Sequence, residues 1–235
     1  MEKRLTELVE KLRGALGGQL VSVILYGSAA RQDHHAKYSD LNVLCVLREV
    51  SPRELRASEP VTRWWRELGN PSPLMLSTEE LESSSDCFAI EFQDMQESRR
   101  VLYGEDAIAN LKIGQRYYRA QVEHELRSKQ LRLRQRAAGV LSDAKALTAL
   151  MLDSVSTFFV LARHALKLSS IEVEPSKRQV AAALPRIGIV SAPFDELLDV
   201  REGKRLPADV DAPALFAEYL KQIEALVRHV DGLEQ

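Results

Sequence analysis

The sequence predicts an α+β protein, with an N-terminal mixed sheet flanked by helices and a C-terminal all-α antiparallel helical bundle. In the first half, short apolar runs rich in β-branched residues alternate with helical patterns. From about residue 116 the chain reads as long amphipathic helices with almost no strand signal. We therefore expect a sheet domain over residues 1–110 and a helical domain over residues 111–235.

The first half begins with a helix and a buried strand. Apolar residues recur at helical spacing over residues 5–16, and Gly17-Gly18 is expected to end that helix. Residues 20–25 are nearly all apolar, which is typical of a strand covered on both faces.

A second strand is expected over residues 40–47, where alternate residues face opposite sides of the sheet. Asp40 and Asn42 therefore project to the same face, together with Leu44 and Val46. The residues between them face the other side.

The next segment carries strong helix signals. Ser51-Pro52-Arg53-Glu54 combines a cap, a proline at the first position and a glutamate at the third. This helix is expected to be interrupted near Pro60 and to end at the Gly69-Asn70-Pro71 turn. Residues 74–76 suit an edge strand, and a short helix should start at Ser77.

Residues 88–95 remain ambiguous, because Phe88, Phe92 and Met95 suit a helix while period-2 alternation suits a strand. In the strand interpretation, Glu91 and Gln93 share one face. Residues 102–106 are expected to form a turn that closes the first domain.

The helical half should contain helices over residues 117–136, 140–168, 176–185 and 213–230, because each has an apolar face at helical spacing. The first of these has an excess of arginine and lysine over acids. Such a run usually forms a solvated helix face, although a contact with a triphosphate or an acidic partner is the alternative.

The bulk composition favours a cytoplasmic protein. The formal charge of −2 gives no reason to expect nucleic acid or an anionic membrane as a partner. No apolar run approaches the roughly 18 residues of a membrane span, and the charged first residues do not resemble a signal peptide. Cys45 and Cys87 are expected to have packing roles.

The chemistry is expected around one turn. Gly27-Ser28 follows the first strand, and eleven residues later the second strand opens with Asp40-Leu41-Asn42. Gly27 permits close approach of the backbone, and Ser28 suits a helix N-cap whose first turn includes Arg31. A helix N-terminus favours anions, so this turn could hold phosphates.

Strand, Gly-Ser turn, loop and strand together resemble the DNA polymerase β-like nucleotidyltransferase superfamily over roughly residues 20–106. The helical half resembles, by its layout, the domains that follow kanamycin-nucleotidyltransferase-like modules, including HEPN domains. The resemblance implies that Gly27, Ser28 and Arg31 bind a nucleoside triphosphate and that Asp40 binds Mg²⁺. It also implies transfer of a nucleotidyl group to a small-molecule or protein hydroxyl, with the acceptor unknown.

Asn42 departs from the family pattern, which has a second carboxylate there. A neutral amide removes about 4 kcal/mol of attraction per unit charge pair at about 4 Å and an effective dielectric near 20, and double that against a divalent ion. We therefore expect weak or single-site Mg²⁺ binding. Glu91 is the candidate third carboxylate and general base, with Asp94 in reserve.

Three hypotheses follow. The first is an active nucleotidyltransferase. The second is a catalytically impaired descendant that binds a nucleotide or a protein, which Asn42 motivates. The third is an interaction module that forms a homodimer through the apolar helix over residues 140–168.

Overall fold

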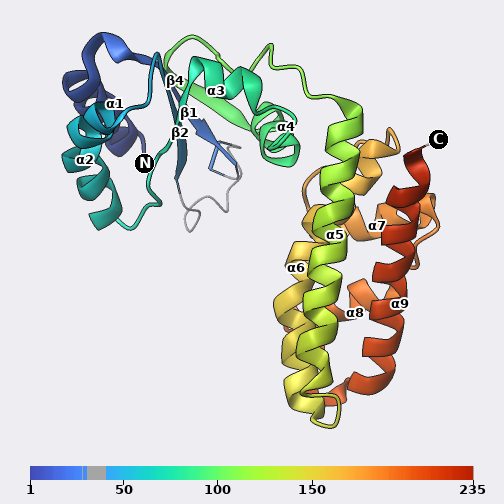
Figure 1. Ribbon diagram of the computed structural model, residues 1–235. Coiled ribbons are helices and arrows are strands. Elements are labelled where there is room, and N and C mark those ends of the chain that lie inside the picture. The colour runs from blue at the N-terminus through green and yellow to red at the C-terminus, as the bar shows by residue number, and fades with distance from the viewer. Residues whose placement is uncertain (28, 31–40, 235) are drawn as a thin grey trace. The chain divides into compact units, whose positions relative to one another are not determined.

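The computed structural model describes residues 1–27, 29–30 and 41–234. The chain divides into two compact units, Met1–Gly114 and Gln115–Gln235 (Figure 1). The first contains a mixed sheet with helices, and the second is built of helices throughout its described part. The α+β class predicted from the sequence is confirmed.

The sheet of the first unit has the strand order β3-β2-β1-β4. Its strands are β1 (Leu20–Tyr26), β2 (Asn42–Leu47), β3 (Leu74–Ser77) and β4 (Arg99–Gly104). The central strand β1 pairs antiparallel with both β2 and β4, while β2 and β3 are parallel. The expected edge strand over residues 74–76 is β3.

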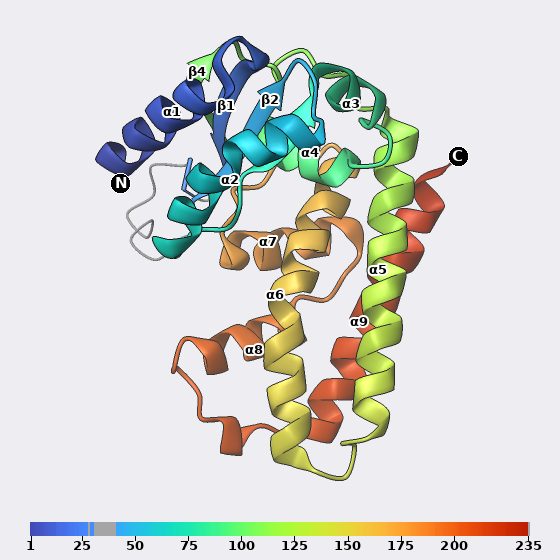
Figure 2. The same ribbon diagram turned by 60° about the vertical axis from the view of Figure 1, so that its left-hand side comes forward.

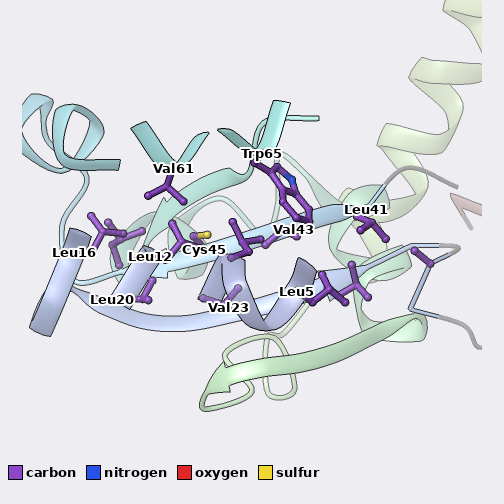
Figure 3. Close-up of a cluster of buried hydrophobic side chains, with 14 residues drawn as sticks. Leu5, Leu12, Leu16, Leu20, Val23, Leu41, Val43, Cys45, Val61 and Trp65 are labelled. Carbon is purple, nitrogen blue, oxygen red and sulfur yellow. The ribbon is translucent and has the colours of Figure 1, made fainter. Parts of the chain in front are cut away.

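One face of the sheet is covered by α1 (Glu2–Leu16) and α2 (Pro52–Glu67). Leu12 of α1 and Trp65 of α2 are completely buried there (Figure 3). Leu8 of α1 is also completely buried in this core. Cys45 lies in the same core, which confirms its packing role.

The opposite face packs against α3 (Thr78–Ser83) and α4 (Ala89–Glu97). Leu44 and Val46 of β2 lie in this second core, whereas Val43 and Cys45 lie in the first. The alternation predicted for β2 is therefore confirmed from Leu41 onward. Both faces of the sheet are covered, as the apolar composition of β1 indicated.

Three expectations for this unit are wrong. The helix α2 continues through Pro60, because Val61 and Trp65 anchor it to the core while Pro60 lies on the exposed side, where a carbonyl without a donor can be hydrated. The expected turn over residues 102–106 is largely strand β4, which continues to Gly104. Cys87 is exposed, so it has no packing role.

The ambiguous segment over residues 88–95 is helical. Phe92 and Met95 of α4 pack onto Ile24 and Leu44 of the sheet, so tertiary packing selects the helical period. The short helix α3 begins at the predicted place with a complete capping box between Ser77 and Glu80.

The second unit contains α5 (Gln115–Ala138), α6 (Ala144–Leu168), α7 (Lys177–Ala183), α8 (Ala192–Arg201) and α9 (Ala212–Asp231). The helix α6 begins at Ala144, where Asp143 provides the N-cap, and not at Val140. The helix α8 lies between the helices expected over residues 176–185 and 213–230, and the sequence did not predict it.

The core of this unit lies between α5, α6 and α9. Ser154 of α6 contacts Tyr219 of α9 at 3.1 Å, and Ser169 contacts His229 at 2.8 Å. Both pairs advance in the same direction along the two helices, so α6 and α9 run parallel to each other, and α5 runs antiparallel to them (Figure 1). The connection that carries α7 and α8 returns the chain to the start of α9.

The basic run on α5 is mostly paired. Arg127 bonds to Glu123 at 2.6 Å, and Lys129 lies 3.3 Å from Glu125. Further pairs join α5 to its neighbours or to itself: Arg134–Glu224, Arg136–Asp153, Arg127–Asp231 and Arg119–Glu123. The run is therefore largely an ion-paired helix face.

By length and composition, α6 is one helix of the described residues that could cross a membrane. Core helices of compact bundles meet the same criterion. Here Phe158 and Phe159 of α6 are buried within the unit, where α6 packs against α5 and α9.

Candidate functional site

A pocket of about 480 Å³ lies where the ends of β1 and β2 meet α4. Its polar lining residues are Tyr26, Asn42, Glu91 and Asp94, with Gly27 beside them. Its apolar lining comes from β3 and α4, and Phe92 and Met95 are buried beneath it. The pocket therefore collects the described residues of the predicted site from three separate elements.

Gly27 forms the turn that leaves β1. Its φ angle is +78°, a left-handed conformation that L residues with a side chain rarely adopt. Its N–H donates to the carbonyl of Ser98 at 2.9 Å, and its own carbonyl accepts from the N–H of Ala30 at 3.0 Å. A Cβ atom added here would lie 3.5 Å from Nδ2 of Asn42, an ordinary contact, so the backbone conformation and not the space favours glycine.

Asn42 is the first residue of β2 and is paired in register with Tyr26, the last residue of β1. Asn42 is half-buried and has its side chain on the same sheet face as Leu44 and Val46. The face predicted for Asn42 is thus the face that α4 covers.

Glu91 and Asp94 both line the pocket from α4, where a spacing of three places them on one side of the helix. Buried Phe92 and Met95 fix the orientation of α4 against the sheet. The strand interpretation for Glu91 is wrong, since the residue is helical. Glu91 nevertheless lines the same pocket as Gly27 and Asn42, as its predicted role in the site requires.

Burial raises the pKa of the Tyr26 hydroxyl, and the negative charge of Glu91 raises that pKa further. The phenol therefore remains protonated well above neutral pH and can donate a hydrogen bond into the pocket. Tyr26 was not among the sequence-predicted site residues. Its signal was available, because alternation along β1 puts it on the face of Ile24.

The donor chemistry of the pocket suits a hard cation. Glu91 and Asp94 supply carboxylates and Asn42 supplies an amide oxygen, and Mg²⁺ prefers oxygen ligands of these kinds. Within the described ranges, no three Asp, Glu, His or Cys side chains form a group that could hold a metal ion. Three of the predicted site residues, Ser28, Arg31 and Asp40, lie outside the described residues.

A larger cavity of about 870 Å³ lies in the same unit between α2 and the segment that leads into β3. Its lining includes Arg63, Arg66 and Glu59, and Arg63 already pairs with Glu59 at 2.5 Å. None of its described lining residues belongs to the Gly27 turn or to α4. The smaller pocket is therefore the better candidate for the chemistry.

No family model and no curated protein matches the chain. Among solved structures, the chain resembles a spectinomycin adenyltransferase from Enterococcus faecialis, whose structure was determined with ATP and spectinomycin. The two chains are 14% identical, the TM-score is 0.59, and the match covers 98% of this chain and 99% of the other. At this identity the likeness shows the fold alone, so this chain shares its fold with that adenyltransferase.

Proposed function

We propose that the protein transfers a nucleotidyl group from a nucleoside triphosphate to a hydroxyl group of a small molecule. The observation that carries this proposal is the single pocket in which the Gly27 turn, Asn42 and the carboxylates of Glu91 and Asp94 come together. ATP is the first donor to test, because the structurally similar adenyltransferase was solved with it.

The proposed reaction is an in-line displacement at phosphorus. The acceptor oxygen forms a bond to the α-phosphorus while the bond from that phosphorus to the bridging oxygen of the β-phosphate breaks, and pyrophosphate leaves. The acceptor proton passes to a carboxylate, for which Glu91 is our candidate and Asp94 the reserve. Both carboxylates line the pocket, so either can reach a hydroxyl bound within it.

The remaining residues have positioning roles in this proposal. Ser28 and Arg31, which follow the turn at Gly27 in the sequence, are the residues we propose to bind the triphosphate. Asp40 and Asn42 are the residues we propose to hold Mg²⁺, which would neutralise phosphate charge when bound. The Tyr26 hydroxyl, kept protonated by its raised pKa, can donate a hydrogen bond to the acceptor or the sugar.

A second candidate function is nucleotide binding without transfer. Asn42 favours it, because this neutral side chain lines the pocket at the position where active relatives of the proposed type carry a carboxylate. The two functions differ in their need for Mg²⁺ and in their response to a restored charge.

The test of transfer uses ATP labelled at the α-phosphate, Mg²⁺ and a panel of hydroxyl-bearing acceptors that begins with spectinomycin and related aminocyclitols. Labelled acceptor should form, and Asp40→Asn and Glu91→Gln should each lower its rate by about 10²-fold or more. Glu82→Gln, an exposed change on α3, is the matched control and should leave the rate unchanged. Transfer that survives both Asp40→Asn and Glu91→Gln would contradict the proposed site.

The second candidate is tested by nucleotide binding measured by calorimetry with and without a chelator. Binding that is indifferent to Mg²⁺, with no transfer to any acceptor, supports the non-catalytic function. For an active enzyme, Asn42→Asp should tighten Mg²⁺ binding, because it restores one unit of negative charge. If Asn42→Asp leaves Mg²⁺ affinity unchanged, Asn42 does not face the metal.

A further inference from the structure

One side of α6 carries a row of residues at helical spacing, and this row faces away from the core of the second unit. Lys145, Ala149, Leu152 and Ser156 follow one another at intervals of four, three and four residues. Such intervals place them in one row along the helix. The row lies on the side of α6 along which the connection from α8 to α9 passes (Figure 2).

An apolar pocket of about 630 Å³ opens between this row and the connection. Ala149 and Leu152 line it from α6, and Leu206 and Val210 line it from the connection. Leu206 is 66% exposed, which is a large apolar exposure at the rim of an apolar pocket. The volume lies within the range of pockets that hold small organic ligands.

Ser156, which follows Leu152 in the row, contacts two cations. The Lys177 ammonium donates to Oγ of Ser156 at 2.9 Å, and Nη1 of Arg201 donates to the same oxygen at 2.7 Å. Nη1 of Arg201 also donates to the carbonyl of Leu152 at 2.9 Å, so this cation is held against the backbone of a residue that lines the pocket. Ser156 lies one helical turn, about 6 Å, beyond Leu152.

The Ser156 oxygen accepts from both cations, so its own hydrogen is available to donate. The remaining hydrogens of the Lys177 ammonium and the Arg201 guanidinium are donors as well. Three groups at this point therefore offer hydrogen-bond donors and a charge of +2.

The charge of Lys177 and Arg201 is not balanced as it is for their neighbours. Arg178 pairs with Asp199 at 2.5 Å and with Glu202 at 2.8 Å, whereas no ion pair forms at Lys177 or Arg201 within the described chain. Burial lowers the pKa of the Lys177 ammonium, and the charge of Arg201 lowers that pKa further. A bound anion would relieve this repulsion.

We propose that the second unit binds a small amphipathic carboxylate, with its apolar body in the pocket at Leu152 and its carboxylate on Lys177, Arg201 and Ser156. The apolar lining supplies affinity by burial, and the two cations select for the negative head group. This proposal does not depend on the nucleotidyl transfer proposed for the first unit.

The test uses the full chain and decanoate, with 1-decanol as the neutral probe of equal length, in calorimetric titrations. Decanoate should bind at least tenfold more tightly than 1-decanol. Lys177→Met and Arg201→Met should each weaken decanoate binding tenfold or more and change 1-decanol binding less than twofold. Ala149→Trp, which fills the pocket, should abolish the binding of both probes.

Lys221→Met is the matched control, because Lys221 is an exposed lysine of α9 outside the described lining of the pocket and should change decanoate affinity less than twofold. Thermal unfolding of each variant checks that it is folded, and Ser156→Ala, a smaller change, should weaken decanoate binding alone. Three results would overturn the proposal: no decanoate binding at 1 mM, equal binding of the two probes, or a loss with Lys221→Met that matches Arg201→Met. Light scattering that shows a dimer dissociated by Ala149→Trp and unaffected by decanoate would also overturn it, since a second copy would then occupy the pocket.

Discussion

Glu91 of α4 raises the pKa of Tyr26, the last residue of β1, across the candidate pocket. This coupling joins a helix whose identity was ambiguous in the sequence to the strand that leads into the Gly27 turn. It also places a negative charge beside a phenol that is kept protonated, so one wall of the pocket can accept hydrogen bonds while the other can donate one.

The coupling predicts a measurable change in Tyr26. A carboxylate disfavours the negative phenolate, so Glu91→Gln should lower the pKa of Tyr26. That pKa should stay above 10.0, because burial is the larger cause and remains. The measurement is an NMR titration of ¹³Cζ-labelled tyrosine, with the Tyr26 signal assigned through Tyr26→Phe.

Glu82→Gln is the control for that titration, since this residue of α3 does not contribute to the shift. If Glu91→Gln leaves the pKa of Tyr26 where it was, Glu91 does not share the pocket with Tyr26. The proposed role of Glu91 as a base would then lose its structural basis.

Two glycines with positive φ predict different costs for the same substitution. Gly27→Ala should destabilise the protein by about 1–2 kcal/mol, the cost of a left-handed conformation, since its added Cβ has ordinary space. Gly104→Ala should cost more, because φ is +75° and the added Cβ would lie 2.0 Å from the backbone oxygen of Val21. Urea unfolding measures both.

Gly139→Ala is the matched control, with no positive φ and its nearest contact at 3.8 Å. It should change the free energy of unfolding by less than about 1 kcal/mol. Equal stability of the Gly104 and Gly139 variants would show that β4 does not end against β1 in this way.

The sheet could be predicted where one strand carries its own signal. The alternation over residues 41–47 assigned each side chain of β2 to the correct core, because successive side chains of a strand point to opposite faces of the sheet. The strand β4 carries no such signal. It begins with Arg99-Arg100 and all its residues before Gly104 are half-buried, so only pairing with β1 identifies it.

The candidate site could also be predicted only where the sequence carries a local signal. Gly27 and Asn42 belong to a local motif, and the structure brings both into one pocket. The prediction for Glu91 assumed that its segment is a strand. The segment is the helix α4, because Phe92 and Met95 pack on the sheet at helical spacing. Tyr26 could be placed on the correct face from the sequence, but its coupling to Glu91 required the position of α4.

The two adjacent tryptophans of α2 should differ strongly in their contributions to stability. The structure buries Trp65 completely and Trp64 partly. Trp65→Ala should therefore cost about 3–5 kcal/mol in the free energy of unfolding. Trp64→Ala should cost clearly less, because water already reaches part of its ring.

Denaturant unfolding followed by circular dichroism measures both tryptophan variants without relying on tryptophan emission. Similar losses for the two variants would mean that the register of α2 on the sheet differs from the one described. Trp65→Phe separates volume from aromatic character and should lie between the wild type and Trp65→Ala.

Glu202 predicts a loss of stability in acid. Hydrogen bonds from Arg178 and then Lys204 lower its pKa from an ordinary value of 4.5 to about 2. A carboxylate with a depressed pKa in the folded state stabilises the protein above its unfolded pKa, and that contribution disappears as the pH falls through the folded value. The contribution of Glu202 should be complete above about pH 5 and should decline between pH 4.5 and 2.

Urea unfolding of the wild type and Glu202→Gln across this range should give two curves that converge toward pH 2. Glu172→Gln, an exposed change, is the control and should run parallel to the wild type. If the Glu202→Gln curve also runs parallel to the wild type, the Arg178–Glu202 contact does not persist in solution, because no proton uptake would then accompany its loss.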